Sequence, residues 1–324
     1  MLSEHQLRSL YLQAKDHAFD YADGAAERNV FPTPEALASL QAHFVEPLPQ
    51  RGGDASAILR CLHEHGSPAS TAQSGGRYFG FVNGGVLPVT LATKWLTDFW
   101  DQNCALHLMS PVASKLEQVC ESWLRELFAL PAETVAGFVS GTSSAILCGL
   151  AAARFRLYQR LDYDFNRRGH CGAPPLRVVA GRHTHSAVLK AAALLGFGTD
   201  CIEWVDVDTQ GRIKPTELPA LDATCIVLLQ AGNVNSGSFD PFREICEAAA
   251  AAGAWVHIDG AFGLWAGGTR RLAHLTDGMQ LAHSWSVDAH KTLNTPYVKC
   301  LCFVSVLCVC AFALASTSYF QQSI

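Results

Sequence analysis

Two charged side chains lie at or shortly after the ends of predicted strands and could act together on a carbonyl compound. Asp259 ends the segment AWVHID, and Lys291 comes three residues after HSWSVD. A lysine amine can form an imine with an aldehyde, whereas a lone lysine in a loop is usually only solvated. A buried carboxylate needs a partner, which could be a protonated ring nitrogen or the first turn of a helix. Together, the two residues predict covalent chemistry on an aldehyde cofactor.

A run of small residues, SGTSS at 140–144, lies between a predicted strand and a predicted helix. Small side chains leave backbone N–H groups open to an anion, and the helix dipole favours negative charge at that end. The run lacks the GxxxxGK[ST] pattern, so we do not expect a nucleoside triphosphate. It predicts a phosphate cradle, with an ordinary tight turn capped by a serine as the alternative.

Histidines and cysteines also occur at spacings that suggest metal ligands. His183 and His185 would share one face of a strand, but no carboxylate or cysteine stands at ligand spacing beside them. We therefore expect no metal ion, and one of these rings either stacks on a flat cofactor or caps a helix. The pairs Cys300/Cys302 and Cys308/Cys310 lie in an apolar run and are expected to be inert packing residues.

The composition excludes several classes of protein. Of the 324 residues, 49% are hydrophobic and 16% are charged, which is too apolar for a disordered chain. The net charge of −5 argues against a nucleic-acid-binding protein. The 12 cysteines show no short-range disulfide spacing, and the polar N-terminus carries no apolar signal segment. We therefore expect a cytoplasmic protein with free thiols.

The order of elements favours an α/β fold. From about residue 110, short apolar segments alternate with helical ones, which predicts a mostly parallel sheet covered by helices on both faces. Ligands of such sheets bind at the carboxyl ends of the strands. Two helix caps are expected, at Ser110 and at Asp240 with Pro241, and the helix after Ser110 should carry an apolar stripe over 116–128. The predicted strands cover 136–140, 177–181, 201–207, 224–232, 254–259 and 283–288.

The domain organisation is predicted from changes in composition. A helical segment over 1–70 precedes a large domain over 71–299, and an apolar, cysteine-rich tail follows over 300–324. The stretch 300–320 has 21 residues, and a transmembrane helix needs about 20. We favour another interpretation, a truncated or mis-spliced product in which the tail replaces a further domain.

The motifs together resemble the group II pyridoxal-phosphate-dependent amino acid decarboxylases, which have the aspartate-aminotransferase-like fold. The HK pair after a strand, downstream of HIDGAFG, is the most specific part of the resemblance. The resemblance covers about residues 20–300, and the matching stretches occur in the family's order. They are RYFGFVNGG (77–85), DQN (101–103), SPVASKLE (110–117), GFVSGTSSA (137–145), HSAVLKAA (185–192), GNVNSGSFDP (232–241), HIDGAFG (257–263) and SVDAHKTLNTPY (286–297).

The resemblance assigns a role to each matched position. It implies that Lys291 carries pyridoxal 5'-phosphate as a Schiff base, that Asp259 pairs with the ring nitrogen and that His185 stacks on the ring. The other assignments are the phosphate turn (Gly141, Thr142, Ser143), positions lining the ring (Asn235, Ala261), positions beside the phosphate and the lysine (Ser286, His290), and the border of the substrate pocket (Tyr78, Phe79).

The implied activity is the decarboxylation of an L-amino acid by a homodimer, with the substrate's side chain unspecified. Family members usually continue well past the lysine with a small C-terminal domain, so we expect activity of this chain to be impaired. Two alternatives remain: another pyridoxal-phosphate enzyme such as an aminotransferase, and a non-catalytic truncated homologue. An aromatic ring usually stands at the position of His185 in the aminotransferases, so the histidine favours the decarboxylase.

Overall fold

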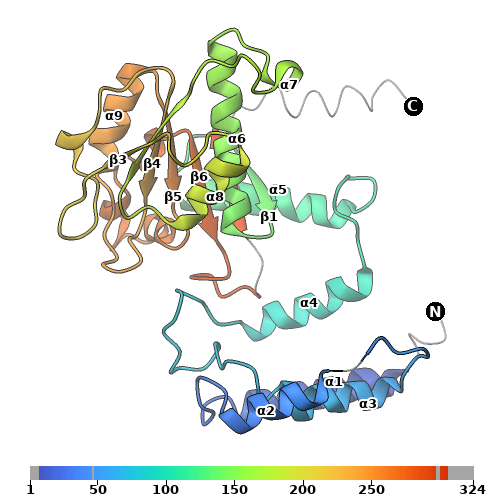
Figure 1. Cartoon of the computed structure of the whole chain (residues 1–324). Coiled ribbons are helices and arrows are strands. Elements are labelled where there is room, and N and C mark those ends of the chain that lie inside the picture. Colours follow the sequence, from blue (N-terminus) through green and yellow to red (C-terminus); the bar gives the residue numbers. More distant parts are fainter. Residues whose placement is uncertain (1–6, 46, 297–299, 306–324) are drawn as a thin grey trace. The chain divides into compact units, whose positions relative to one another are not determined.

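The computed structural model describes residues 7–45, 47–296 and 300–305. The chain forms two compact units, Met1–Gly85 and Val86–Ile324. Figure 1 shows a helical N-terminal unit and a larger unit built around a sheet. The division into three domains that the sequence suggests stays a prediction.

Helices make up the regular structure of the N-terminal unit as far as it is described. The Thr33 hydroxyl and the Asp54 carboxylate cap two of them by accepting backbone N–H bonds, as these residue types favour. The elements of this unit are α1 (Arg8–Asp23), α2 (Pro34–His43), α3 (Ala55–Cys61) and the π-helix η1 (Leu62–Gly66).

A seven-stranded sheet organises the larger unit, in the order β1-β7-β6-β5-β4-β2-β3. Neighbouring strands from β6 to β3 run parallel, whereas β7 is antiparallel to both β1 and β6. The strands are β1 (Thr134–Val139), β2 (Arg177–Gly181), β3 (Ile202–Val205), β4 (Cys225–Gln230), β5 (Trp255–Asp259), β6 (Ser284–Asp288) and β7 (Cys300–Ser305). The α-helices of this unit are α4 (Pro88–Trp100), α5 (Pro111–Leu127), α6 (Thr142–Arg160), α7 (Phe165–Arg168), α8 (Ser186–Leu194) and α9 (Phe242–Ala252). The described connections also contain four 3-10 helices, η2 (Pro215–Glu217), η3 (Gly263–Gly268), η4 (Ala273–Thr276) and η5 (Met279–Leu281).

The central strands are buried on both faces, which is why they are continuously apolar in sequence. Alternate residues of β4 point to opposite cores: Val227 packs in the cluster that includes α9, and Ile226 packs in the cluster that includes α6 and α8. Figure 1 shows α6 and α8 on one side of the sheet and α9 on the other. The predicted α/β architecture is confirmed.

Three local expectations differ from the structure. Asp240 does not cap α9, because its buried carboxylate instead accepts the backbone N–H groups of Ile213 and Gln230 at 2.8 and 2.7 Å. Ser110 stands at the N-cap of α5, but its hydroxyl makes no capping bond. The predicted apolar stripe of α5 is only partly buried, since Phe128 is 1% exposed whereas Trp123 is 68% exposed.

The start of the apolar tail belongs to the sheet. Cys300–Ser305 is β7, which fills the space between β1 and β6, and all six of its residues are buried. Within the described part of the chain, no helix is both long and apolar enough to cross a membrane. The remainder of the predicted tail, 306–324, lies outside the described residues.

Candidate active site

The chemically active residues gather at one edge of the sheet. Strands β5 and β6 run parallel and end in carboxylates, Asp259 and Asp288. Strand β7 runs the opposite way, so its first residue, Cys300, lies beside Asp288. The β1 residue Val139 also pairs with Cys300, and the turn that opens α6 follows it. The topology therefore brings the predicted phosphate turn and both carboxylates to the same edge.

Asp259 is a buried carboxylate held by its neighbours. The Ala261 backbone N–H and the Ser286 hydroxyl both donate to Oδ1, at 3.1 and 3.4 Å. Burial raises the pKa of Asp259, while the Ala261 hydrogen bond and the positive charges of Lys291 and His185 act in the opposite direction. A carboxylate in this position would be stabilised by a cationic partner in the cavity.

The predicted phosphate turn forms the N-terminus of α6. Gly141 is its N-cap, with no side-chain capping bond, and the helix begins at Thr142. A Cβ at Gly141 would meet no other described heavy atom within 4 Å, so open space lies beside this helix end. The first-turn N–H groups of a helix have no partner within the helix, and an anion in that space would satisfy them.

Lys291 lies against Asp288, which the sequence analysis did not select. Its Nζ is 3.2 Å from Asp288 Oδ2, and the Asp288 side chain is only 1% exposed. Lys291 also lies 5.6 Å from the centre of the Phe262 ring. The available sequence signal is a carboxylate at the end of a strand, three residues before the lysine. It is the same strand-end signal that identified Asp259.

Cys300 is part of this cluster. Its thiol donates to Asp288 Oδ1, and its sulfur lies 3.9 Å from both His290 Nδ1 and Thr142 Oγ1. Burial is the main cause that raises the pKa of this thiol to about 12, and the hydrogen bond to Asp288 is the second. Cys300 therefore lines the site as well as packing in the sheet, and its inertness stays a prediction.

The cluster of Asp288, His290 and Cys300 contains side-chain types that can bind a metal ion. The Lys291 ammonium lies 3.2 Å from the same carboxylate, and it would repel a divalent cation there. The expectation that no metal is bound stays a prediction.

His185 has two roles open to it. Its Nδ1 accepts the Ala187 backbone N–H at 3.2 Å, so it caps α8 as one of the sequence alternatives proposed. It also lowers the pKa of Asp259, which places the ring within electrostatic reach of that carboxylate. Stacking on a cofactor ring stays a prediction. His183 instead lies near Gly211, where a Cβ would meet its Nδ1 at 2.7 Å.

The remaining predicted residues are only partly brought together. Ala261 links the two carboxylate-bearing strands, since its carbonyl accepts the Asp288 N–H at 2.9 Å. The hydrogen bond of Ser286 joins it to Asp259, whereas the resemblance put it beside the phosphate or the lysine. Asn235 is exposed in a turn that the buried Asn233 side chain organises. The roles of Ser286 and Asn235 stay predictions.

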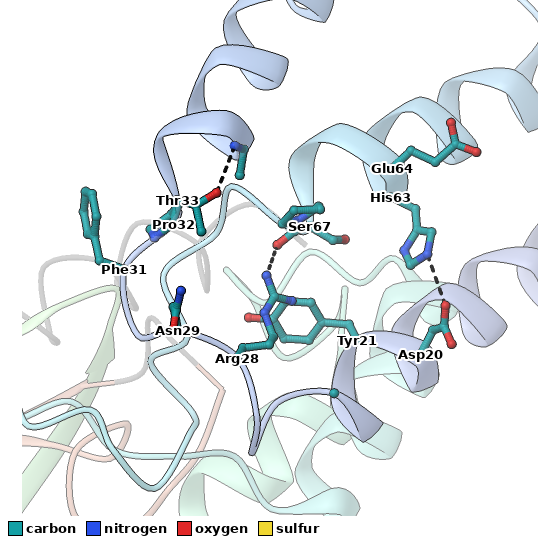
Figure 2. Close-up of a pocket in the computed structure, with 13 residues that line it drawn as sticks. Asp20, Tyr21, Arg28, Asn29, Phe31, Pro32, Thr33, His63, Glu64 and Ser67 are labelled. Atoms are coloured by element: carbon teal, nitrogen blue, oxygen red, sulfur yellow. Dashed lines mark hydrogen bonds and ion pairs between the residues drawn. The ribbon is translucent and has the colours of Figure 1, made fainter.

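The N-terminal unit holds a separate pocket of about 530 Å³. Figure 2 shows its lining, in which Arg28 donates to the Ser67 carbonyl and His63 approaches Asp20. The predicted catalytic and cofactor-binding residues do not line it. Tyr78 and Phe79 belong to the same unit, and Phe79 is 92% exposed. Their predicted place at a substrate pocket is untested.

Known proteins resemble this chain over most of its length. L-2,4-diaminobutyrate decarboxylase of Rhizobium meliloti (strain 1021) is 28% identical over 318 residues, which cover 91% of this chain and 58% of the relative. The chain thus spans less than two thirds of that relative's length. The crystal structure of mouse CSAD superposes with a TM-score of 0.82 at 26% identity, covering 92% of this chain and 64% of that chain.

The fold is also that of Oryza sativa TDC, solved with PLP, at a TM-score of 0.84 and 24% identity; the match covers 93% of this chain and 67% of that chain. A family model described as the pyridoxal-dependent decarboxylase conserved domain matches residues 45–305. That range includes every strand of the sheet. It also includes the residues that gather at the sheet edge, namely Asp259, Asp288, Lys291 and Cys300. The chain belongs to the pyridoxal-dependent decarboxylase family.

Proposed function

We propose that this chain binds pyridoxal 5'-phosphate at the carboxyl edge of the sheet and acts as an L-amino acid carboxy-lyase. The observation that carries the proposal is the joint placement of a lysine, a buried carboxylate and an uncapped helix N-terminus at that edge. The family membership and the 28% identity to a decarboxylase support it. The substrate class is an amino acid, with its side chain unassigned.

The residues present fit this cofactor. Asp259 is buried, burial raises its pKa, and a protonated ring nitrogen would supply the cationic partner that it needs. The open space at Gly141 adjoins a helix N-terminus suited to a phosphate. Lys291 provides the amine for attachment to the aldehyde. When bound, pyridoxal phosphate supplies a ring that accepts the electron pair left when an α-carboxylate departs as CO₂.

The chain's own groups would orient and polarise the bound molecules. Asp259 would keep a proton on the ring nitrogen, and the α6 N-terminus would hold the phosphate. His185 is fixed by its bond to the Ala187 N–H, so its ring can cover the cofactor without a large loss of side-chain entropy. We expect a homodimer from the family resemblance, and the exposed apolar side chains of α4, such as Trp95 and Phe99, offer surface for it.

The cytoplasm is the proposed compartment. Ten cysteines in the described part of the chain are free, and several are buried beside apolar side chains. Free buried thiols are typical of proteins in a reducing environment.

An absorbance scan and a product assay test the function. With pyridoxal phosphate added, we expect an absorption band from the lysine-bound cofactor and release of CO₂ from at least one member of a panel of L-amino acids. A band with an oxo acid and no CO₂ would indicate an aminotransferase instead. Absence of both the band and CO₂ would indicate a non-catalytic homologue.

A further inference from the structure

We propose that Asp288 is a positioning residue for Lys291, and that its carboxylate holds the amine in place and restrains its reactivity. The proposal deepens the proposed function, on which it rests for the importance of Lys291. It assigns a role to a residue that the strand-end motif left unexplained. The evidence comes from the geometry around the carboxylate.

Asp288 is fixed in place by its backbone. Its N–H donates to the Ala261 carbonyl at 2.9 Å, and its own carbonyl accepts the Trp265 indole N–H at 2.9 Å. The residue is the last of β6 and is 1% exposed. The side chain therefore starts from a rigid position, and no solvent-exposed loop has to order before it can hold Lys291.

Both oxygens of the carboxylate are engaged. Oδ1 accepts the Cys300 thiol proton, while Oδ2 lies 3.2 Å from Lys291 Nζ and 3.8 Å from His290 Nε2. One oxygen of the carboxylate thus contacts the thiol, and the other contacts the lysine. A buried, hydrogen-bonded carboxylate interacts with an ammonium more strongly than an exposed one, because water screens the pair less.

Charge balance explains why this contact matters for chemistry. Lys291 is 18% exposed, and it lies against the Phe262 ring, so solvent alone solvates its ammonium poorly. Asp259 also acts on Lys291 electrostatically, but Asp288 is the carboxylate that contacts it. An amine held in an ion pair with a buried carboxylate is less available to attack an aldehyde or an acylating reagent. Asp288 therefore orients the side chain while restraining its reactivity.

Competitive acetylation of the cofactor-free chain tests this inference without depending on cofactor binding. Acetic anhydride is the probe, Lys291 and the exposed Lys190 are quantified in the same digest, and their ratio is compared at one pH. Asp288→Asn keeps the size and the oxygen acceptor for Cys300 but removes the charge. We expect it to raise the relative labelling of Lys291 about tenfold, because the amine is no longer held by a charged partner.

Cys300→Ala is the matched control, because it removes a neighbour of Asp288 and keeps the charge. It should change the ratio by less than about twofold. A ratio in Asp288→Asn within that range would overturn the proposal, as would an equal increase in both variants. Lys190 corrects for the amount of reagent, because it is already exposed in the folded chain. Since unfolding would also expose Lys291, the comparison is made without urea, at a pH where each variant shows the wild-type unfolding transition.

Chemical rescue provides a second test if the amide variant folds poorly. Asp288→Ala leaves space for a small carboxylate, so added formate should lower the labelling ratio towards the wild-type value. A purely structural role predicts no effect of formate beyond that of chloride at the same ionic strength, and that result would contradict the proposal. Failure to bind pyridoxal phosphate would refute the proposed function but leave the labelling result standing.

Discussion

The N-terminal unit and the strand edge both bring acidic and basic side chains together, but they treat the charges differently. In the N-terminal pocket, His63 approaches Asp20 at 3.4 Å, and their side chains are 23% and 79% exposed. At the strand edge, Lys291 and Asp288 are 18% and 1% exposed. Exposed pairs are screened and contribute little to stability, whereas buried charges carry a desolvation cost.

The difference in burial of the charged side chains indicates which of the two regions performs chemistry. A half-exposed pair such as that of His63 needs no function to explain it. A buried carboxylate with a raised pKa, such as Asp259, is stabilised only if something cationic meets it. The pocket in Figure 2 is a poor guide to the site, since none of the predicted catalytic residues lines it. Burial of charge at strand ends is the better guide.

The largest expected effect concerns Asp259. Asp259→Asn should lower CO₂ release by at least about a hundredfold, the scale for losing one electrostatic group at a reacting centre. The neutral amide cannot hold a proton on the ring nitrogen, while Lys291 remains available for attachment. Turnover and the absorption band of the bound cofactor should be measured together. Near-normal turnover would show that the buried Asp259 carboxylate matters no more for the reaction than an exposed carboxylate.

A second prediction contrasts two glycines of the same region. A Cβ at Gly149 would meet the buried His257 ring at 2.7 Å, so Gly149→Ala should destabilise the chain by about 1–3 kcal/mol through overpacking. Gly141→Ala is the control, because its Cβ enters open space and its φ of −179° is extended. Urea unfolding should show a clear loss only for Gly149→Ala. Equal losses would mean that α6 does not pack on β5 as described.

The control variant also tests the cradle. Because the added methyl would occupy the space assigned to the phosphate, Gly141→Ala should weaken pyridoxal phosphate binding while leaving the fold stable. Titration followed by absorbance measures this directly. Unchanged affinity would place the phosphate elsewhere.

A pH prediction follows from the buried histidine of β5. Burial lowers the pKa of His257 to about 3, whereas an unfolded histidine titrates at about 6.5. Below about pH 6.5 the unfolded chain binds a proton that the folded chain excludes, so stability falls with falling pH by up to about 1.4 kcal/mol per unit from this group.

Comparison with His257→Asn isolates that contribution. Burial also lowers the pKa of His283, to about 4, and this background cancels in the difference between the two proteins. The free energy of unfolding should therefore fall less steeply with falling pH in the variant. The difference should appear below about pH 6.5, the pKa of a histidine in the unfolded chain. Parallel pH profiles would show that His257 is not buried in its neutral form.

The smallest expected effect lies in the N-terminal unit. Asp20→Asn removes the partner of His63 but should change the free energy of unfolding by less than about 1 kcal/mol, as for other exposed pairs. It should leave pyridoxal phosphate affinity unchanged. A loss of affinity comparable to that expected for Gly141→Ala would contradict this prediction and make the pocket part of the site.

The strands and two central site residues could be predicted because their signals are local. Asp259 and Lys291 follow apolar runs, and the strand-end rule turns that position into proximity. Asp288 carried the same signal but was counted only as the end of its strand. Cys300 was assigned to packing, because the sequence does not show that β7 runs antiparallel and pairs it with Asp288.

Other errors came from distant partners that a local pattern cannot show. Asp240 precedes a helix and so suggests a cap, but its carboxylate reaches Ile213, which is 27 residues earlier in the chain. The apolar spacing of α5 predicted a buried face, yet Trp123 is 68% exposed. Periodicity identifies a helix and its apolar side, while burial depends on what lies opposite.

The attachment of the cofactor to Lys291 is the central claim, and reductive trapping tests it most directly. The full chain is incubated with pyridoxal phosphate, treated with sodium borohydride and digested, and the labelled peptide is identified by mass spectrometry. The account predicts a pyridoxyl group on Lys291 and loss of that label in Lys291→Ala. A label on a different lysine, or equal labelling of many lysines with none preferred, would contradict it.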